Sequence, residues 1–461
     1  MAIPSEFAAR VRDRLGTERV LDDPADCWVY GSDNSRKHAP PGLVAFPESH
    51  DEVAALVRLC NEYAQAFVAR GRGTGTCGGA IPADGGVVLA LERMDRIISE
   101  DPGNRALTAQ SGVLNGAVQA AAARHGLFWP PDPSSAGYCT IGGNLAFNAA
   151  GPRAVKYGTP RENVLGLRAV TGGGEELRTG VYTTKGVVGY DLTRLIIGSE
   201  GTLAIVTEAV LKLTPLSEAR RLLRAQYRDA AAAAAAVVRV MTQPVTPCAL
   251  EFLDRGSLEL LRDDAALAIN ADAGALLLAE VDGPASAIED FADCLARALA
   301  GPGLLDLRRA RDTAEGEALW AARKALSPAL RRLAPNKLNE DVVVPVTEIP
   351  ALLEGLEALS REYGIPILSF GHAGNGNLHV NLLYDTQDAL QARNAEPCLK
   401  RVFELVVRLK GTLSGEHGVG REKRDYVALE VEPVTLALMR RIKTQFDPNG
   451  LLNPGKIFPI A

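Results

Sequence analysis

The chain has 461 residues, of which 47% are apolar and 23% are charged, and its formal net charge is −6. This slightly acidic balance argues against a nucleic-acid-binding protein, which usually carries a basic surplus. The same balance argues against an intrinsically disordered chain. At about 150 residues per domain, the length predicts roughly three structural units.

The first half of the chain predicts a mixture of helices and strands. Ser49 and Glu52 form a capping-box pattern ahead of an apolar stripe, which predicts a helix over 49–63. Further elements follow in chain order: strands over 66–69, 86–91 and 106–113, a helix over 114–125, a hairpin over 164–179 turning at 172–174, and a strand over 203–213.

After Pro215 the pattern changes to alternating strands and helices with few glycines, which predicts a second α+β domain. Its expected strands cover 221–227, 248–253, 275–282 and 341–345, and its expected helices cover 229–241, 284–300, 312–333, 347–363 and 387–409. Residues 411–420 are glycine-rich again. We therefore expect the C-terminal segment to fold back onto the first domain.

The cysteines and the N-terminus indicate the compartment. Seven cysteines occur without a Cys-x-x-Cys pair, which predicts reduced thiols. The N-terminus lacks an apolar core, so no signal peptide is expected. No stretch approaches ~18 consecutive apolar residues, so no transmembrane helix is predicted. We expect a cytoplasmic protein, and peripheral attachment to the inner membrane through a partner is compatible with this.

A glycine-rich loop at 70–80 reads RGRGTGTCGGA and fits G-x-G-x-x-G through Gly73, Gly75 and Gly78. A Rossmann site needs a helix directly after this loop to hold the pyrophosphate. The following residues include a proline and two glycines, which argue against such a helix. Backbone N–H groups of the loop can instead form an anion-binding nest. A glycine turn without any ligand is the other interpretation.

Two further segments support a bound cofactor. Residues 130–151 read PPDPSSAGYCTIGGNLAFNAAG, a loop composition that nevertheless carries apolar side chains. We expect this loop to pack against a large planar ligand. Residues 198–206 read GSEGTLAIV and lead into a strand.

These loops, together with YDLTRLIIGSEGTLAIVTEA and FDPNGLLNPGKIF, resemble the FAD-linked oxidase family, whose flavin fold is that of vanillyl-alcohol oxidase. The branch that fits best contains glycolate oxidase, D-lactate dehydrogenase and D-2-hydroxyglutarate dehydrogenase. The resemblance covers about 40–461. It implies an α+β protein with an FAD-binding domain over 1–217 (flavin core about 40–217), a substrate cap domain over 218–410, and a C-terminal segment, 411–461, that completes the active site and packs on the FAD domain.

The resemblance also implies which residues contact FAD. The residues expected around the pyrophosphate are Gly71, Gly73, Thr74, Gly75, Gly78 and Gly79. The residues expected along the rest of the cofactor are Pro133, Ser134, Thr140, Gly143, Asn144, Asn148, Glu200, Ile205 and Asn453. Some members of this fold attach the flavin through a histidine where this chain has Thr74. We therefore expect noncovalent FAD.

Three of the six histidines lie late in the chain, His372 and His379 in FGHAGNGNLHVNL and His417 in SGEHGVG. Imidazole and carboxylate groups are common ligands of zinc, iron and manganese. A loop followed by a strand could bring His372 and His379 together, with Glu416 as a third ligand and an open position for substrate. Histidines at this spacing are also often unrelated, so the residues alone leave both interpretations open.

In the 2-hydroxy-acid branch, the residues that match His372, His379 and Glu416 hold a divalent metal, which could be zinc, manganese or iron. Asn381 and His417 match residues that bind substrate and act as the base. A histidine suits proton removal near neutral pH. Asn375 replaces a frequent aspartate of the family, and no ligand role is expected for it.

Arg323 resembles the arginine that holds the substrate carboxylate in this family, and a guanidinium can bind a carboxylate through two parallel hydrogen bonds. The alternative is an exposed residue on a helix. Ser327 lies one turn further along the same predicted helix, and Lys337 follows. Together they favour a substrate with a second carboxylate.

The expected function is therefore FAD-dependent, metal-assisted oxidation of a D-2-hydroxy acid to the 2-oxo acid. The electron acceptor could be a quinone, a cytochrome or an electron-transfer flavoprotein. Two alternatives stay open: a metal-free FAD oxidase of another alcohol, and a glycolate oxidase-type flavin subunit of a larger redox complex. No nucleic-acid partner is expected. The oligomeric state is open, with a homodimer as one candidate.

Overall fold

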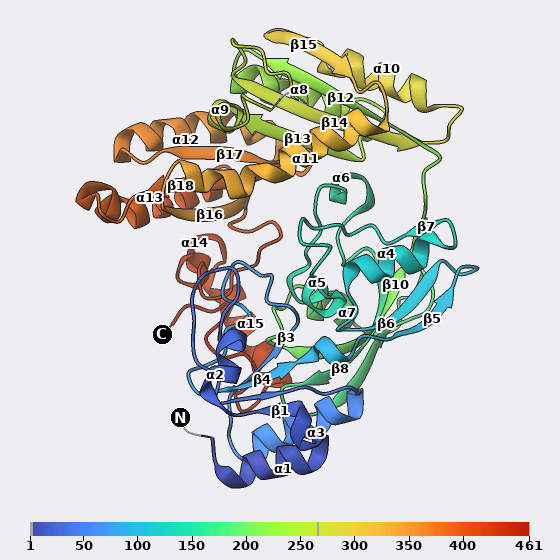
Figure 1. Ribbon diagram of the computed structural model, residues 1–461, viewed down its shortest axis with the longest axis vertical. Helices are drawn as coiled ribbons and strands as arrows, with labels where there is room; N and C mark the ends of the chain where they lie inside the picture. Colours follow the sequence, from blue (N-terminus) through green and yellow to red (C-terminus); the bar gives the residue numbers. More distant parts are fainter. Residues whose placement is uncertain (1–2, 265–266, 461) are drawn as a thin grey trace. The chain divides into compact units, whose positions relative to one another are not determined.

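The computed structural model describes residues 3–264 and 267–460, and the chain divides into two compact units. Unit 1 comprises Met1–Gly151, Gly158–Leu216 and Glu416–Ala461. Unit 2 comprises Pro152–Tyr157 and Ser217–Gly415. The chain thus enters unit 2 twice and returns to unit 1 for its last segment (Figure 1).

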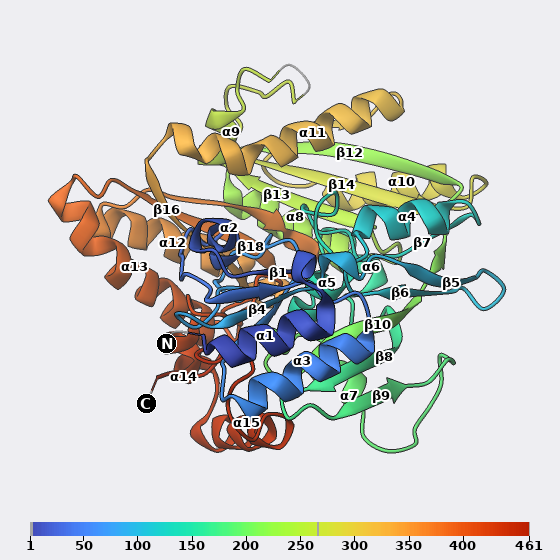
Figure 2. The ribbon, with the colours of Figure 1, turned by 60° about the horizontal axis from the view of Figure 1, so that its bottom comes forward.

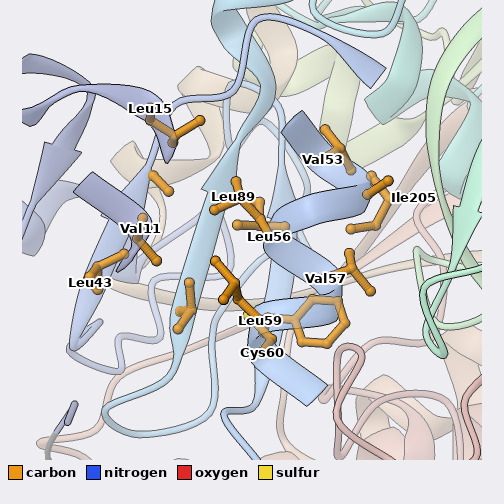
Figure 3. Close-up of a cluster of buried hydrophobic side chains, with 14 of the residues drawn as sticks. Val11, Leu15, Leu43, Val53, Leu56, Val57, Leu59, Cys60, Leu89 and Ile205 are labelled. Carbon is orange, nitrogen blue, oxygen red and sulfur yellow. The ribbon is translucent and has the colours of Figure 1, made fainter. Parts of the chain in front are cut away.

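The first sheet of unit 1 has the strand order β1-β2-β4-β3. Its strands are β1 (Val20–Leu21), β2 (Leu43–Ala45), β4 (Val87–Ala90) and β3 (Phe67–Arg70), and β2, β4 and β3 are parallel. Helices α1 (Ser5–Leu15) and α3 (His50–Glu62) pack on this sheet through a shared core of leucine, valine and phenylalanine side chains (Figure 3). The predicted helix over 49–63 is confirmed, with Ser49 Oγ accepting from the Glu52 amide at 3.2 Å.

The second sheet of unit 1 is antiparallel throughout, with the order β5-β6-β10-β8-β9. Its strands are β5 (Ile97–Asp101), β6 (Ala106–Gln110), β10 (Ala204–Lys212), β8 (Val164–Thr171) and β9 (Glu176–Gly180). The β8–β9 hairpin confirms the predicted turn at 172–174, where Gly174 has a φ of +88°.

The other elements of unit 1 are the short antiparallel strand pair β7 (Leu127–Phe128) and β11 (Thr214–Pro215), and the helices α2 (Pro24–Cys27), α4 (Asn115–Ala123), α5 (Ile141–Phe147), α7 (Leu192–Ile196), α14 (Val427–Glu430) and α15 (Pro433–Phe446). The expectation of a loop throughout 130–151 is wrong at α5. The N-cap of this helix is Thr140, whose hydroxyl accepts from the Gly143 amide, and an N-cap side chain of this kind stabilises a helix despite two glycines.

Unit 2 is built on a seven-stranded antiparallel sheet with the order β15-β12-β14-β13-β17-β18-β16. In chain order its strands are β12 (Ala219–Tyr227), β13 (Ala249–Asp254), β14 (Ala275–Gly283), β15 (Leu304–Arg309), β16 (Asn336–Val343), β17 (Ile367–His372) and β18 (Asn377–Tyr384). The helices are α6 (Ala154–Tyr157), α8 (Ala230–Thr242), α9 (Arg255–Leu260), α10 (Ile288–Leu299), α11 (Thr313–Ala329), α12 (Ile349–Tyr363) and α13 (Ala389–Arg408).

The two faces of this sheet differ in what covers them. Helices α9 and α11 pack on one face through a core that includes Leu253, Leu326 and Phe370 (Figure 2). On the other face Tyr227 is buried and donates its hydroxyl proton to the Leu299 carbonyl of α10 at 2.8 Å. The face under α9 and α11 is called the α11 face below.

Among the described residues, no helix combines the length and the apolar character needed to cross a lipid bilayer.

Candidate functional site

The glycine loop of unit 1 runs from the end of β3 to β4 without any helix, as predicted. Gly73 and Gly78 have φ values of +64° and +74°, in the left-handed region that L side chains rarely adopt. Alternation into this region turns successive backbone N–H groups to one side, which is the conformation of an anion-binding nest. The loop geometry therefore fits a pyrophosphate.

Two glycines of this loop lie directly against the segment that contains α5. A Cβ atom on Gly71 would lie 2.4 Å from Thr140 Oγ1, and one on Gly79 would lie 2.4 Å from the Phe147 ring. Neither position has room for a larger side chain. The structure thus places Gly71 beside Thr140 and Gly79 beside Phe147, at the two ends of α5 in the second predicted segment. Pro133 and Ser134 lie just before this segment, and Asn148 ends α5 with a φ of +53°.

Glu200 is a buried carboxylate at a strained backbone position, with a φ of +54°. Its two carboxylate oxygens accept hydrogen bonds from the amides of Val419, at 2.6 Å, and Gly420, at 2.7 Å. Burial raises the pKa of this carboxyl, and the two amide hydrogen bonds oppose that shift. Glu200 therefore holds the segment that directly follows His417. The hydroxyl of the neighbouring Ser199 is buried without a hydrogen-bond partner among the described residues, which fits a missing cofactor contact.

The C-terminal segment contributes a second buried group. The Asn453 side-chain amide donates to the carbonyls of Gly79, at 3.0 Å, and Glu200, at 2.9 Å. Lys456 donates from Nζ to the Ile81 carbonyl at 2.8 Å and to Asn453 Oδ1 at 2.9 Å. Burial, together with the charge of Arg421, lowers the pKa of Lys456 to about 7. Hydrogen bonds thus hold the C-terminal segment against the glycine loop. Ile205, another predicted cofactor residue, is buried in the core of the first sheet of the same unit.

In unit 2, His372 and His379 lie on the adjacent strands β17 and β18. Their ring centroids are 5.2 Å apart and their planes are close to perpendicular, at 84°. The turn between them, at Ala373–Asn375, is the tight turn that the glycines predicted, but His372 ends a strand instead of lying in a loop. The pair offers two imidazole groups, which are common ligands of zinc, iron and manganese.

Glu416 and His417 begin the last segment of unit 1. Their backbone follows Gly415, whose amide donates to the Asp341 carbonyl at 2.8 Å, and Asp341 pairs with His379 in the β16–β18 register. The chain therefore passes next to the strand of His379 one residue before Glu416. Within unit 1, Glu416 Oε2 accepts from the Gly151 amide at 2.9 Å.

Arg323 does not lie on an exposed helix surface. It is 9% exposed, and its guanidinium stacks over the Phe370 ring at 4.7 Å. Its Nε donates to Glu251 Oε2 at 2.8 Å, and the other oxygen of Glu251 lies 2.5 Å from His372 Nδ1. Burial would raise the pKa of Glu251, but the charges of His372 and Arg323 hold it down to about 2.

The remaining predicted substrate residues lie on or beside the same α11 face. Asn381 is fully buried and donates to the His379 carbonyl at 3.1 Å, while its Oδ1 has no hydrogen-bond partner among the described residues. Lys337 Nζ lies 3.4 Å from Ser327 Oγ. An orphaned buried acceptor two residues along β18 from His379 fits a polar ligand.

Sequence reasoning missed Glu251 and Lys456. Glu251 lies inside the apolar strand β13, where the only other charged residue, Asp254, ends the strand. No spacing rule connects Glu251 with its partners Arg323 and His372, which lie 72 and 121 positions later. A charged residue inside a predicted buried strand is the only signal that could have drawn attention to it, because such a charge is costly unless paired. Lys456 lies in the FDPNGLLNPGKIF motif but carried no predicted role.

Comparison with known protein families agrees with this geometry. The FAD binding domain matches residues 41–180, and the C-terminal domain of FAD linked oxidases matches residues 216–457. The chain also resembles p-cresol methylhydroxylase, with a TM-score of 0.79 and 17% identity, covering 98% of this chain and 96% of that structure. The 4-ethylphenol oxidase of Gulosibacter chungangensis gives a TM-score of 0.77 at 21% identity, covering 99% and 98%. The predicted α+β flavoprotein fold of the vanillyl-alcohol oxidase type is thereby confirmed.

Curated relatives cover nearly the whole chain. Glycolate oxidase subunit GlcD of Bacillus subtilis (strain 168) is 38% identical, over 96% of this chain and 94% of the relative. D-lactate dehydrogenase of Anaerostipes hadrus is 35% identical, over 97% and 94%. D-2-hydroxyglutarate dehydrogenase of Xanthomonas citri pv. viticola is 36% identical, over 95% and 94%. The chain therefore belongs to the FAD-linked oxidase family of oxidoreductases.

Proposed function

We propose that this protein is an FAD-dependent dehydrogenase that oxidises a D-2-hydroxy acid, of the D-lactate or D-2-hydroxyglutarate type, to the 2-oxo acid. The observation that carries the proposal is the group formed by His372, His379, Asn381 and Arg323 in a chain that also has an FAD-binding domain. The group combines two imidazole ligands, a buried acceptor and a cation. Relatives named for these two dehydrogenase activities support the substrate class.

The cofactor, the metal and the site residues would each have a distinct role in the reaction. FAD, held noncovalently, would supply the acceptor for a hydride from the substrate Cα, and a divalent metal (zinc, manganese or iron) would supply a Lewis acid that makes the substrate hydroxyl more acidic. His372, His379 and Glu416 would ligate the metal. Arg323 would hold the carboxylate, and Asn381 would fix the orientation of the hydroxy acid.

His417 would remove the hydroxyl proton. It lies in the segment that Glu200 fixes through the amides of Val419 and Gly420, so its position relative to the flavin loop is set within unit 1. Ser327 and Lys337 would contact a second carboxylate, which favours the hydroxyglutarate type over lactate. The electron acceptor would be a quinone, a cytochrome or an electron-transfer flavoprotein. We propose a cytoplasmic location, with attachment to the inner membrane only through such a partner.

A second candidate is a glycolate oxidase-type flavin subunit of a larger redox complex. It is favoured by the relatives named glycolate oxidase subunit GlcD, in Bacillus subtilis (strain 168) and Escherichia coli (strain K12), which are 38% and 36% identical to this chain.

Steady-state turnover by the isolated chain with an artificial electron acceptor tests the proposal. We expect turnover of a D-2-hydroxy acid that a chelator abolishes and that added zinc, manganese or iron restores. Activity in protein with less than about a tenth of an equivalent of metal would contradict the metal and favour a metal-free oxidase. Absence of turnover with every 2-hydroxy acid would favour the subunit of a larger complex.

A further inference from the structure

One buried carboxylate in unit 2, that of Glu251, contacts both the proposed metal ligand His372 and the proposed substrate-binding residue Arg323. Glu251 is 1% exposed. Its Oε1 lies 2.5 Å from His372 Nδ1, and its Oε2 accepts from both Nε and Nη2 of Arg323 at 2.8 Å. Each oxygen of a single carboxylate therefore serves a different residue. A carboxylate this deeply buried needs both partners to offset its lost hydration.

The fold fixes this arrangement from three sides. Glu251 on β13 and His372 on β17 are directly opposed in the antiparallel register, so their side chains share the α11 face. Arg323 enters from α11, and its guanidinium rests on the Phe370 ring at 4.7 Å. Phe370 is itself paired with Leu253 in the same register. The carboxylate thus links His372 of β17 to Arg323 of α11.

The contacts determine which atoms can serve the reaction. Because Nδ1 of His372 donates to Glu251, a metal would be ligated through Nε2, and a carboxylate at the far nitrogen makes an imidazole a stronger ligand. Glu251 also occupies the Nε and Nη2 edge of Arg323. A substrate carboxylate would then bind the other edge, formed by Nη1 and Nη2, in the two-bond geometry that a guanidinium allows.

We propose that Glu251 is a positioning residue that couples metal binding at His372 to substrate-carboxylate binding at Arg323. This inference rests on the proposed function, because it concerns the metal and substrate of that site. The carboxylate shares its charge between the two partners, so a change at one alters the hydrogen bond to the other. Coupling of this kind is reciprocal: metal tightens substrate binding by the same factor as substrate tightens metal binding.

The first test is Glu251→Gln in the full-length, FAD-loaded protein, with zinc as the probe. We expect the zinc dissociation constant, measured by competition with a chromophoric chelator in the absence of substrate, to rise about 10- to 100-fold. KM for the D-2-hydroxy acid should rise more than kcat falls. The control is Glu280→Gln, a neighbouring carboxylate on β14 that binds Trp320 Nε1 at 3.2 Å and touches neither Arg323 nor His372. The control should bind zinc within twofold of the wild type.

The second test uses Arg323→Met, which can be measured alone if a Glu251 variant fails to fold. Arg323→Met removes a residue that is not a metal ligand, so without coupling its effect on zinc binding would not depend on Glu251. In a double-mutant cycle, Arg323→Met and Glu251→Gln are measured singly and together. We expect their effects on the zinc dissociation constant to be non-additive by at least about threefold. If the double variant is unstable, Arg323→Met alone should change zinc affinity by at least about threefold.

The outcomes separate this inference from the proposed function. Wild-type protein that binds no zinc, manganese or iron contradicts the proposed metal site itself, and the inference with it. If the wild type binds zinc and Glu251→Gln binds it equally well, the coupling is overturned and the proposed function stays in place. The same holds if the wild type binds zinc and Arg323→Met leaves the zinc affinity unchanged.

Discussion

Replacing His417 with alanine should lower kcat about 10²- to 10⁴-fold, because a general base contributes a factor of this size. FAD content and metal content should stay close to those of the wild type. His417 is half-buried, and the segment after it is held by the Glu200 carboxylate through the Val419 and Gly420 amides, neither of which involves the imidazole. The measurement is steady-state turnover of a D-2-hydroxy acid with an artificial acceptor, alongside the flavin spectrum and metal analysis.

The matched control is His125→Ala. His125 is a partly exposed histidine of the same unit that pairs with Glu100 at 2.7 Å and has no proposed role in the reaction. Its replacement should leave kcat within twofold of the wild type. A fall of less than about tenfold in His417→Ala would show that another group, or water, takes the hydroxyl proton.

Replacing Gly420 with alanine should weaken FAD binding about 10- to 100-fold. A Cβ atom at Gly420 would lie 2.0 Å from the backbone carbonyl oxygen of Cys77 in the glycine loop, and its φ is +51°. Because the clash is with backbone, no rotamer change relieves it, and the loop must shift. Overpacking of this kind typically costs about 1–3 kcal/mol. The FAD dissociation constant of refilled apoprotein, followed by flavin fluorescence, provides the measurement.

Gly450→Ala separates loop displacement from backbone strain. Gly450 has a similar φ of +64°, but nothing lies within 4 Å of a Cβ atom there. This variant should lose some stability and keep its FAD affinity within twofold. Equal loss of FAD in both variants would show that strain in the C-terminal part of the chain, and not contact with the glycine loop, controls cofactor binding.

Helices were predicted well where a cap and an apolar stripe coincide. The helices expected over 229–241 and 387–409 occur as Ala230–Thr242 and Ala389–Arg408, each with an aspartate N-cap. Strand β16 is longer than the predicted 341–345, because Asn336 to Asp341 are polar apart from Leu338 and gain their strand conformation from pairing with β18. Strand β15 was missed for a related reason: its alternation of leucine with charged residues was hidden between two helices, and only pairing with β12 defines it.

The individual residues of the candidate site could be predicted from the sequence, but the contacts between them could not. Residue types indicated His372 and His379, and the family resemblance added Asn381 and Arg323, because each belongs to a recognisable segment. Glu251 could not be found this way, since its importance comes from cross-strand register, which a sequence without known strand pairing does not define. The same applies to Glu200, predicted to line the cofactor: the structure shows its carboxylate binding backbone amides of a segment about 220 residues away.

The central claim is that a D-2-hydroxy acid reduces the flavin of this protein. An anaerobic visible spectrum of the purified yellow protein, recorded before and after addition of substrate, tests it most directly. D-lactate, D-2-hydroxyglutarate, glycolate and L-lactate would be compared in parallel. We predict that a D-acid bleaches the flavin band and L-lactate does not, with D-2-hydroxyglutarate acting most readily if Ser327 and Lys337 bind a second carboxylate. A yellow protein that no 2-hydroxy acid bleaches would contradict the proposed chemistry and favour a non-catalytic flavin subunit of a larger complex.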